Sequence, residues 1–89
     1  MLEAITLFLH ESDIGKFWDV DGDRAVGYNN RLFRWSWDKI SISLHDDQVQ
    51  VHFYIQSDNK KGEYHMYDFC WFNIADPQFF DNLVSVLKR

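Results

Sequence analysis

The feature that most constrains the fold is an alternation of apolar and polar residues that spans 40–44 and resumes over 49–55. A period of two is typical of strands that bury one face, so we predict a strand in each segment. Between them, Asp46 and Asp47 form a short polar break that predicts a two-residue turn. The resulting hairpin collects the apolar residues on one face, with the pairs Leu44 and Val49, Ile42 and Val51, and Ile40 and Phe53.

Length and composition indicate one small domain that spans residues 1–89. The chain is too short for two cores, while a hydrophobic content of 46% and an aromatic content of 18% support a real core and exclude a disordered chain. The net charge of −5 argues against binding to a phosphate backbone, which requires a basic face. The same charge suits a basic protein partner, or simply keeps a small protein in solution.

Cys70 is the single cysteine, which excludes an internal disulfide framework and makes a reducing cytoplasm the expected location. We expect no signal peptide, because the N-terminal residues lack a basic region followed by a long apolar one. No apolar stretch approaches the roughly 18 residues of a membrane span, so we also expect no membrane association.

The N-terminal residues carry weaker patterns. The apolar segment 4–10 predicts a first strand, with an amphipathic helix as the alternative. A short helix capped by Ser12 and Asp13 is expected to reach Trp18. Residues 19–23 contain three aspartates and a glycine, and they predict a turn or loop.

Residues 24–37 predict a second hairpin with its tip at Asn29 and Asn30, because asparagine tolerates the left-handed backbone of tight turns. Phe33, Trp35 and Trp37 occupy odd positions, whereas Ile40 and Ile42 in the next strand occupy even ones. We therefore expect a β-bulge or a break between strands near 38–39.

Segment 63–72 predicts a strand with apolar residues on both faces, so its register depends on the loop before it. With a five-residue loop at 58–62, the odd-numbered aromatic residues enter the core. With a four-residue loop, Asp68 enters the core together with Met66 and Cys70. Burying an unpaired carboxylate is costly, so we favour the five-residue loop. The pairs that it predicts are Tyr67 with Phe53, Phe69 with Val51 and Trp71 with Val49.

The clearest helix closes the chain. Asp76 is a good N-cap, and Pro77 suits the first helical position. The apolar residues at helical spacing are Phe80, Leu83, Val84 and Leu87. Together with the strands, this helix predicts an α+β fold: an antiparallel sheet of about four to six strands in a meander of hairpins, with the C-terminal helix packed on one face.

Acidic residues alternate over 19–23 (DVDGD), a pattern that resembles the first half of an EF-hand calcium loop. The second half departs from that pattern, since Arg24 stands where the loop needs its glycine and Asn30 where it needs its glutamate. We interpret the segment as a solvated acidic turn and expect no cofactor. The weak candidate metal ligands are Asp19, Asp21 and Asp23.

The predicted register also gathers Ser41, His52 and Asp68 in one row across three strands, where neighbouring Cβ atoms lie about 4.5–5.5 Å apart. These are the residue types of a nucleophile, a base and an orienting acid, so a small hydrolase is one alternative function. An open sheet face offers no oxyanion site, and cross-strand hydrogen bonding therefore explains the row better.

The chain has four Trp, four Tyr and eight Phe, more aromatic rings than one helix on one sheet needs. Trp, Tyr and Arg dominate the hot spots of protein interfaces, so we expect some of these residues to contact a partner. The leading prediction is a small acidic protein-binding module of the inhibitor, immunity or anti-defence type, which binds a basic partner surface stoichiometrically and is not an enzyme. The expected contact residues are Asp21, Asp23, Arg34, Trp35, Trp37, Asp46, Asp47 and Tyr54.

Other functions stay open. A cation-dependent binding module would use the 19–23 loop, and a homo-oligomer would use exposed edge strands or aromatic faces that pair with copies of themselves. A stacking platform for single-stranded nucleic acid needs a positive groove, which the net charge of −5 disfavours.

Overall fold

The computed structural model, which describes residues 2–12, 14–29, 36–57 and 62–88, contains a five-stranded antiparallel sheet and two helices. The strands are ordered β1-β2-β3-β4-β5, so the sheet is a meander with β1 and β5 at its edges, and the predicted α+β fold is confirmed. No helix in the described part of the chain is long and apolar enough to cross a bilayer. The elements are α1 Leu2–Glu11, β1 Lys16–Asp21, β2 Arg24–Tyr28, β3 Lys39–His45, β4 Gln48–Gln56, β5 Tyr64–Asn73 and α2 Phe79–Leu87.

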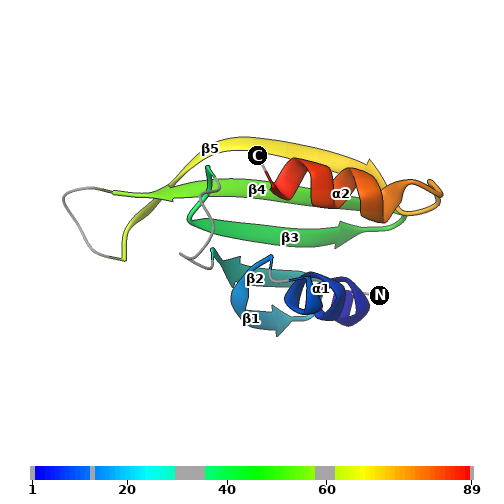
Figure 1. Ribbon diagram of the computed structural model, residues 1–89, viewed down its shortest axis with the longest axis horizontal. Coiled ribbons are helices and arrows are strands. Elements are labelled where there is room, and N and C mark those ends of the chain that lie inside the picture. The colour runs from blue at the N-terminus through cyan, green and yellow to red at the C-terminus, as the bar shows by residue number, and fades with distance from the viewer. Residues whose placement is uncertain (1, 13, 30–35, 58–61, 89) are drawn as a thin grey trace.

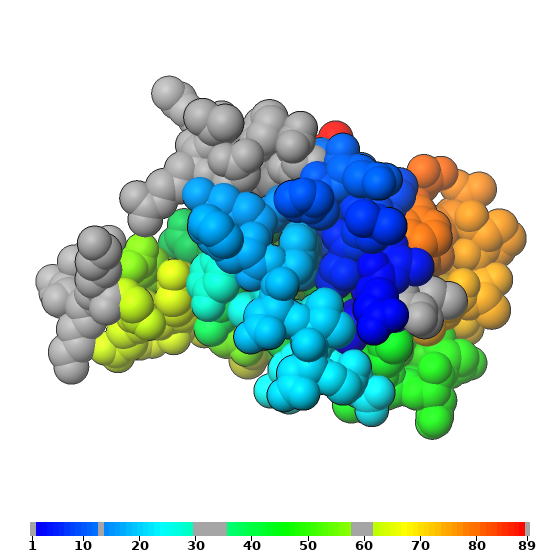
Figure 2. Space-filling model, turned by 90° about the horizontal axis from the view of Figure 1, so that it is seen from below, coloured from blue at the N-terminus to red at the C-terminus, as the bar shows by residue number. Residues whose placement is uncertain are grey.

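Both helices lie on the same face of the sheet, α1 beside β1 and β2, and α2 beside β5 (Figure 1). The view from the β1 edge shows this helical layer above the strands (Figure 2). One hydrophobic cluster fills the space between the layers, and each fully buried aliphatic side chain in it stabilises the fold by about 1.5–3 kcal/mol. Its fully buried members include Ile5, Leu9, Ile40, Ile42, Val49, Val51, Leu83 and Leu87. The described helices leave the opposite side of the sheet uncovered, and we call that side the open face.

The central hairpin has the predicted register. Its core-facing pairs are Leu44 with Val49, Ile42 with Val51 and Ile40 with Phe53. The two-residue turn at Asp46 and Asp47 is also confirmed, because His45 pairs with Gln48. Asp46 has a φ of 56° and Asp47 does not have a positive φ. Positive φ at the first turn position alone matches a type II′ turn, in which glycine is the usual residue.

The strand predicted over 4–10 is wrong, because these residues belong to α1. Leu2, Ile5 and Leu9 are spaced by three and four residues, and all three are buried against the sheet. A strand would have placed Leu2 and Ile5 on opposite faces, whereas a helix places them on one. The alternative of an amphipathic helix is therefore the correct one.

The short helix predicted to reach Trp18 is also wrong, because Lys16–Asp21 forms the edge strand β1. Gly15 turns the chain out of α1 with a φ of 132°, which side-chain-bearing residues rarely adopt. The indole of Trp18 then packs closely on β2 at Gly27, where an added Cβ would lie 2.6 Å from the ring. A tertiary contact between an aromatic ring and a glycine thus fixes this segment as strand.

The start of β1 is irregular. Its register with β2 shifts between Lys16 and Asp19, and Phe17 within this shift has a φ of 55°. The loop predicted over 19–23 is confirmed only for its second half, since Gly22 and Asp23 form the turn to β2 while the preceding residues belong to β1.

The strand predicted at the start of 24–37 is confirmed as β2, which pairs with β1 on one side and β3 on the other. The hairpin predicted within 24–37 is wrong, because β1 and β3 already occupy the two sides of β2 and leave no place for a return strand beside it. The Asn30 end of its predicted tip and residues 31–35 lie outside the described residues. The break predicted near 38–39 is confirmed: Trp37 lies outside the strands, fully buried, and β3 begins at Lys39.

The register of β5 is the main correction within the sheet. Gln56 pairs with Tyr64 and Tyr54 with Met66, as the five-residue loop predicts. The register then shifts by one residue, so that Tyr67 forms a β-bulge and Asp68 lies opposite Phe53. Beyond the bulge, Cys70 faces Val51 and Phe72 faces Val49, while Phe69 and Trp71, predicted in the core, point to the open face.

The C-terminal helix is confirmed, but it begins later than predicted. Asp76 shapes the turn before it, because its Oδ1 accepts a hydrogen bond from the Gln78 N–H at 2.9 Å and its carbonyl accepts one from the Phe79 N–H at 3.0 Å. The helix therefore starts at Phe79, and Phe80 is partly exposed. The buried residues of α2 are Phe79, Leu83 and Leu87.

Candidate binding face

Two rows of side chains cross the open face from β1 to β5. One row consists of Asp19, Val26, Ser41, His52 and Phe69, and the other of Asp21, Arg24, Ser43, Gln50 and Trp71. In both rows the side chain is acidic at the β1 edge, a serine on the central strand β3 and aromatic at the β5 edge. The open face therefore has a carboxylate side and an aromatic side.

The aromatic side is built from Phe69 and Trp71, which are 58% and 59% exposed. They occupy alternate positions of β5, so their Cα atoms lie about 6.5 Å apart and both rings project from the same face. The imidazole of His52 stacks on Phe69 with 5.9 Å between ring centroids and 24° between planes. Large exposed rings that gather on an uncovered sheet face are typical of interaction sites.

A second aromatic group lies farther along the open face, around Lys39. The ammonium of Lys39 lies 4.5 Å from the ring centroid of Tyr54 and 4.7 Å from that of Tyr64. Tyr28 packs on Tyr64 with 5.9 Å between their ring centroids. Tyr54, predicted to contact a partner, thus lies on the open face, and it is half-buried by this cation–π contact.

The acidic turns meet at one end of the sheet. The Leu44 N–H donates to the carbonyl of Asp23 at 2.8 Å, which joins the β1–β2 turn to the end of β3. The Ile74 N–H donates to the carbonyl of Asp47 at 2.8 Å, which joins the β3–β4 turn to the end of β5. The four predicted contact residues at this end are all exposed: Asp21, Asp23, Asp46 and Asp47.

The acidic residues of the 19–23 segment are spread along a strand and the turn that follows it. Asp19 and Asp21 are alternate residues of an extended strand, which separates their Cα atoms by about 6.5 Å, and Asp23 lies in the turn beyond. Across the described residues, no group of three His, Cys, Asp or Glu side chains is arranged to hold a metal ion. The strand thus disperses the oxygens that an EF-hand loop would gather.

The row predicted for a hydrolase is broken by the β5 bulge. Ser41 pairs with His52 as expected, but the next residue in the row is Phe69. Asp68 lies opposite Phe53, and its Oδ1 accepts a hydrogen bond from the Phe69 N–H at 2.8 Å. Ser41, His52 and Asp68 therefore do not form a nucleophile, base and acid.

Trp37, which was predicted to contact a partner, is buried instead. It has no exposed surface, and its Nε1–H donates to the carbonyl of Leu87 at 2.7 Å. A buried indole cannot anchor a partner, and its role is to tie the end of α2 to the sheet. Arg34 and Trp35, the other two predicted anchors in this region, lie outside the described residues.

The exposed aromatic residues on the open face that the sequence pattern placed in the core are Phe69 and Trp71. A strand with apolar residues on both faces signals that one set is exposed, but the choice of set depends on a one-residue bulge. The preference for keeping Asp68 out of the core pointed to the wrong set. In the structure the bulge places Asp68 on the helix side, where its carboxylate remains exposed.

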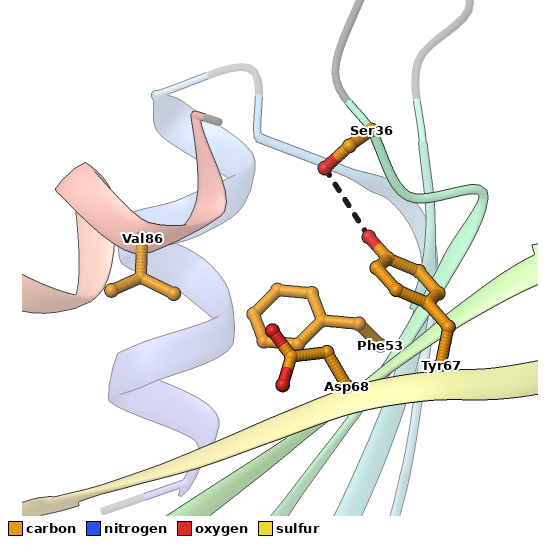
Figure 3. A pocket seen from close by; sticks show the side chains of 5 residues that line it. All are labelled: Ser36, Phe53, Tyr67, Asp68 and Val86. Atoms are coloured by element: carbon orange, nitrogen blue, oxygen red, sulfur yellow. Dashed lines mark hydrogen bonds between the residues drawn. The ribbon is translucent and has the colours of Figure 1, made fainter.

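The described residues line at least two hollows on the helix side of the sheet. A small one of about 40 Å³ is lined by Tyr67, Asp68 and Phe53 from the sheet, by Ser36 and, across from them, by Val86 of α2 (Figure 3). Tyr67 Oη donates to Ser36 Oγ at 3.2 Å. A space of this size holds water and excludes a substrate.

The larger hollow is an open groove of about 320 Å³ between α1 and β1. Leu7 and Phe17 on its rim are 58% and 74% exposed. The Trp18 Nε1 is buried and has no hydrogen-bond partner among the described residues. The groove lies on the helix side, away from Trp71. Substitutions of its exposed residues can therefore serve as controls for substitutions on the open face.

Comparison with known proteins gives no match: no protein-family model, no curated protein and no solved structure shows significant similarity to this chain.

Proposed function

We propose that this chain is a stoichiometric binding module, of the inhibitor or immunity type, that docks the basic surface of another protein on its open face. The observation that carries this proposal is the placement of Phe69 and Trp71, more than half exposed, on a sheet face that no described helix covers. Acidic turns lie at one end of the same sheet.

The aromatic rings supply the affinity in this proposal. A large aromatic side chain removes about 150–250 Å² from water when it is fully buried, so two rings side by side form a suitable centre for an interface. Trp is among the residue types enriched at hot spots, where truncation costs about 2 kcal/mol or more. His52 supports Phe69 by stacking, which limits the entropy lost when a partner covers the ring.

The carboxylates supply the choice of partner. Within the described residues, no ion pair joins Asp21, Asp23, Asp46 or Asp47 to a cation, so their charge is available to an incoming surface. A negative rim attracts a basic partner, raises the association rate and disfavours acidic competitors. A reducing cytoplasm, which suits a chain with a single cysteine, is the compartment that we propose for this encounter.

Site-specific photo-crosslinking tests the proposal. The variant Trp71→p-benzoylphenylalanine places a crosslinker on the aromatic side of the open face, and Phe17→p-benzoylphenylalanine places the same group at a more exposed position on the helix side. Both purified variants are irradiated in lysate of the source cells at low and at moderate salt, and crosslinked proteins are identified by mass spectrometry.

We expect one basic protein to crosslink at position 71 and not at position 17, with a yield that falls as salt rises. Adding Asp46→Asn and Asp47→Asn to the position 71 variant should lower that yield. Equal crosslinking from both positions would contradict the proposal, and so would capture of an acidic protein. Crosslinking of the chain to itself would instead establish self-association through the open face.

A further inference from the structure

We infer that the open face recognises arginine side chains of its partner, by stacking their guanidinium planes on the indole of Trp71 beside the Asp46-Asp47 turn. This inference rests on the proposed function and adds the chemistry of the contact. It commits the occupant of the face to an arginine-bearing basic segment.

The first observation is that this face already holds one cation on aromatic rings. The ammonium of Lys39 lies within 5 Å of two ring centroids, at 4.5 Å from Tyr54 and 4.7 Å from Tyr64. The negative π face of an aromatic ring attracts a cation, and Trp attracts it more strongly than Tyr or Phe. Trp71 is the strongest such acceptor on the described part of the open face, and it is 59% exposed.

The second observation is the position of the β3–β4 turn. Gln50 pairs with Trp71 and Gln48 pairs with Asn73. The carbonyl of Asp47 accepts a hydrogen bond from the N–H of Ile74, the residue that follows Asn73. The backbone of Asp47 therefore lies about three residues along β5 from Trp71, or roughly 10 Å. A segment whose first arginine stacks on Trp71 can therefore present a second arginine to the Asp46-Asp47 turn.

Arginine fits this site better than lysine. Its guanidinium is planar, so it stacks on a flat ring, and it gives up its water more readily than an ammonium does. It also forms bidentate hydrogen bonds with carboxylates. Lys39 is held beside its rings by the fold, whereas a cation of a partner must lose bound water to reach Trp71. Arginine is favoured because its guanidinium loses that water more easily than an ammonium does.

The test uses three matched peptides, Ac-(Gly-Arg)4-NH2, Ac-(Gly-Lys)4-NH2 and Ac-(Gly-citrulline)4-NH2, titrated into the full chain. The readout is the indole Nε1–H signal of Trp71 in ¹H–¹⁵N spectra, assigned from its absence in Trp71→Leu. We expect the arginine peptide to shift this signal and to bind about three- to tenfold tighter than the lysine peptide, the range expected for a cation–π contact. The uncharged citrulline peptide should leave the signal unchanged.

The variants make the test specific. Trp71→Leu should abolish the preference for arginine, Trp71→Phe should keep part of it, and Phe17→Leu should leave it unchanged. Both positions are exposed, and thermal melting confirms that each variant folds. Equal shifts with arginine and lysine, a shift with citrulline, or no shift with any peptide would overturn the inference.

The inference and the proposed function fail separately. If a basic protein crosslinks at position 71 while the peptides show no preference for arginine, the face binds its partner through other contacts. If the arginine preference holds while no protein crosslinks there, the face has the chemistry inferred here and the proposed function is wrong.

Discussion

The indole of Trp37 donates a hydrogen bond to the carbonyl of Leu87, 2.7 Å away and 50 residues later in the chain. The last carbonyls of a helix lack partners within the helix, and this bond satisfies one of them in the core. Because neither side chain has any exposed surface, water cannot replace the bond. The contact fixes the C-terminal end of α2 against the sheet.

Trp37→Phe should therefore lower stability sharply. The substitution leaves the Leu87 carbonyl buried without this donor, which costs about 1–3 kcal/mol, and the smaller ring adds a cavity penalty of about 1 kcal/mol. For a chain of this length, a loss of about 2 kcal/mol lowers the melting temperature by at least about 8 °C. Trp71→Phe is the matched control, and it should change stability by no more than about 0.5 kcal/mol. Equal losses from the two variants would show that the hydrogen bond contributes nothing.

The turn between β3 and β4 predicts effects of opposite sign at neighbouring aspartates. Asp46 has a φ of 56°, so Asp46→Gly removes backbone strain and should raise the free energy of unfolding by about 0.5–1 kcal/mol. Asp47 has no positive φ, so Asp47→Gly only adds freedom to the unfolded chain and should lower stability by a similar amount. Chemical denaturation of both variants measures the difference. Changes of the same sign would contradict the assigned turn geometry.

The contact between Gly27 and Trp18 predicts a coupled pair. An added Cβ at Gly27 would lie 2.6–2.7 Å from three atoms of the indole ring, so Gly27→Ala should destabilise the chain by about 1–3 kcal/mol. Trp18→Leu removes the obstructing ring, and in that background Gly27→Ala should cost much less. A double-mutant cycle measures the coupling, which we expect to reach about 1 kcal/mol or more. Additive losses would mean that the alanine acts through the backbone alone.

These contacts show which parts of the fold local pattern could predict. The β3–β4 hairpin was predictable because its two strands alternate cleanly, and a one-residue slip would turn a whole apolar set toward water. The N-terminal apolar segment fits a strand as well as a helix, and only the joint burial of Leu2 and Ile5 separates them. The edge strand β1 depends on Trp18 packing against Gly27, a contact between separate elements that no local pattern contains.

The acidic residues of the candidate site could be predicted from the sequence, whereas its exposed aromatic residues could not. Asp46 and Asp47 are exposed because turn residues lie at the surface, and the meander brings them to the same end as the β1–β2 turn. Trp71 faces outward because Tyr67 adds a bulge, and both faces of β5 carry apolar residues that fit either register. The bulge is accompanied by the hydrogen bond from Tyr67 Oη to Ser36 Oγ, which joins residues 31 apart in the chain and therefore depends on the assembled fold.

The acidic turn at Asp46 and Asp47 predicts how charge affects peptide binding. Asp46→Asn with Asp47→Asn removes two negative charges beside the aromatic side, while Glu3→Gln with Asp81→Asn removes two exposed ones from the helices. Both double variants change the net charge equally, so a long-range effect of net charge would weaken binding of Ac-(Gly-Arg)4-NH2 equally. Carboxylates that meet the peptide should instead contribute about 0.2–1 kcal/mol each at low salt, so the turn variant should bind about two- to thirtyfold more weakly. Calorimetry at increasing salt should bring the turn variant and the unmodified chain together, because exposed charges are screened within about 10 Å at 0.1 M. If the helix variant weakens binding as much as the turn variant does, the turn is not part of the binding surface.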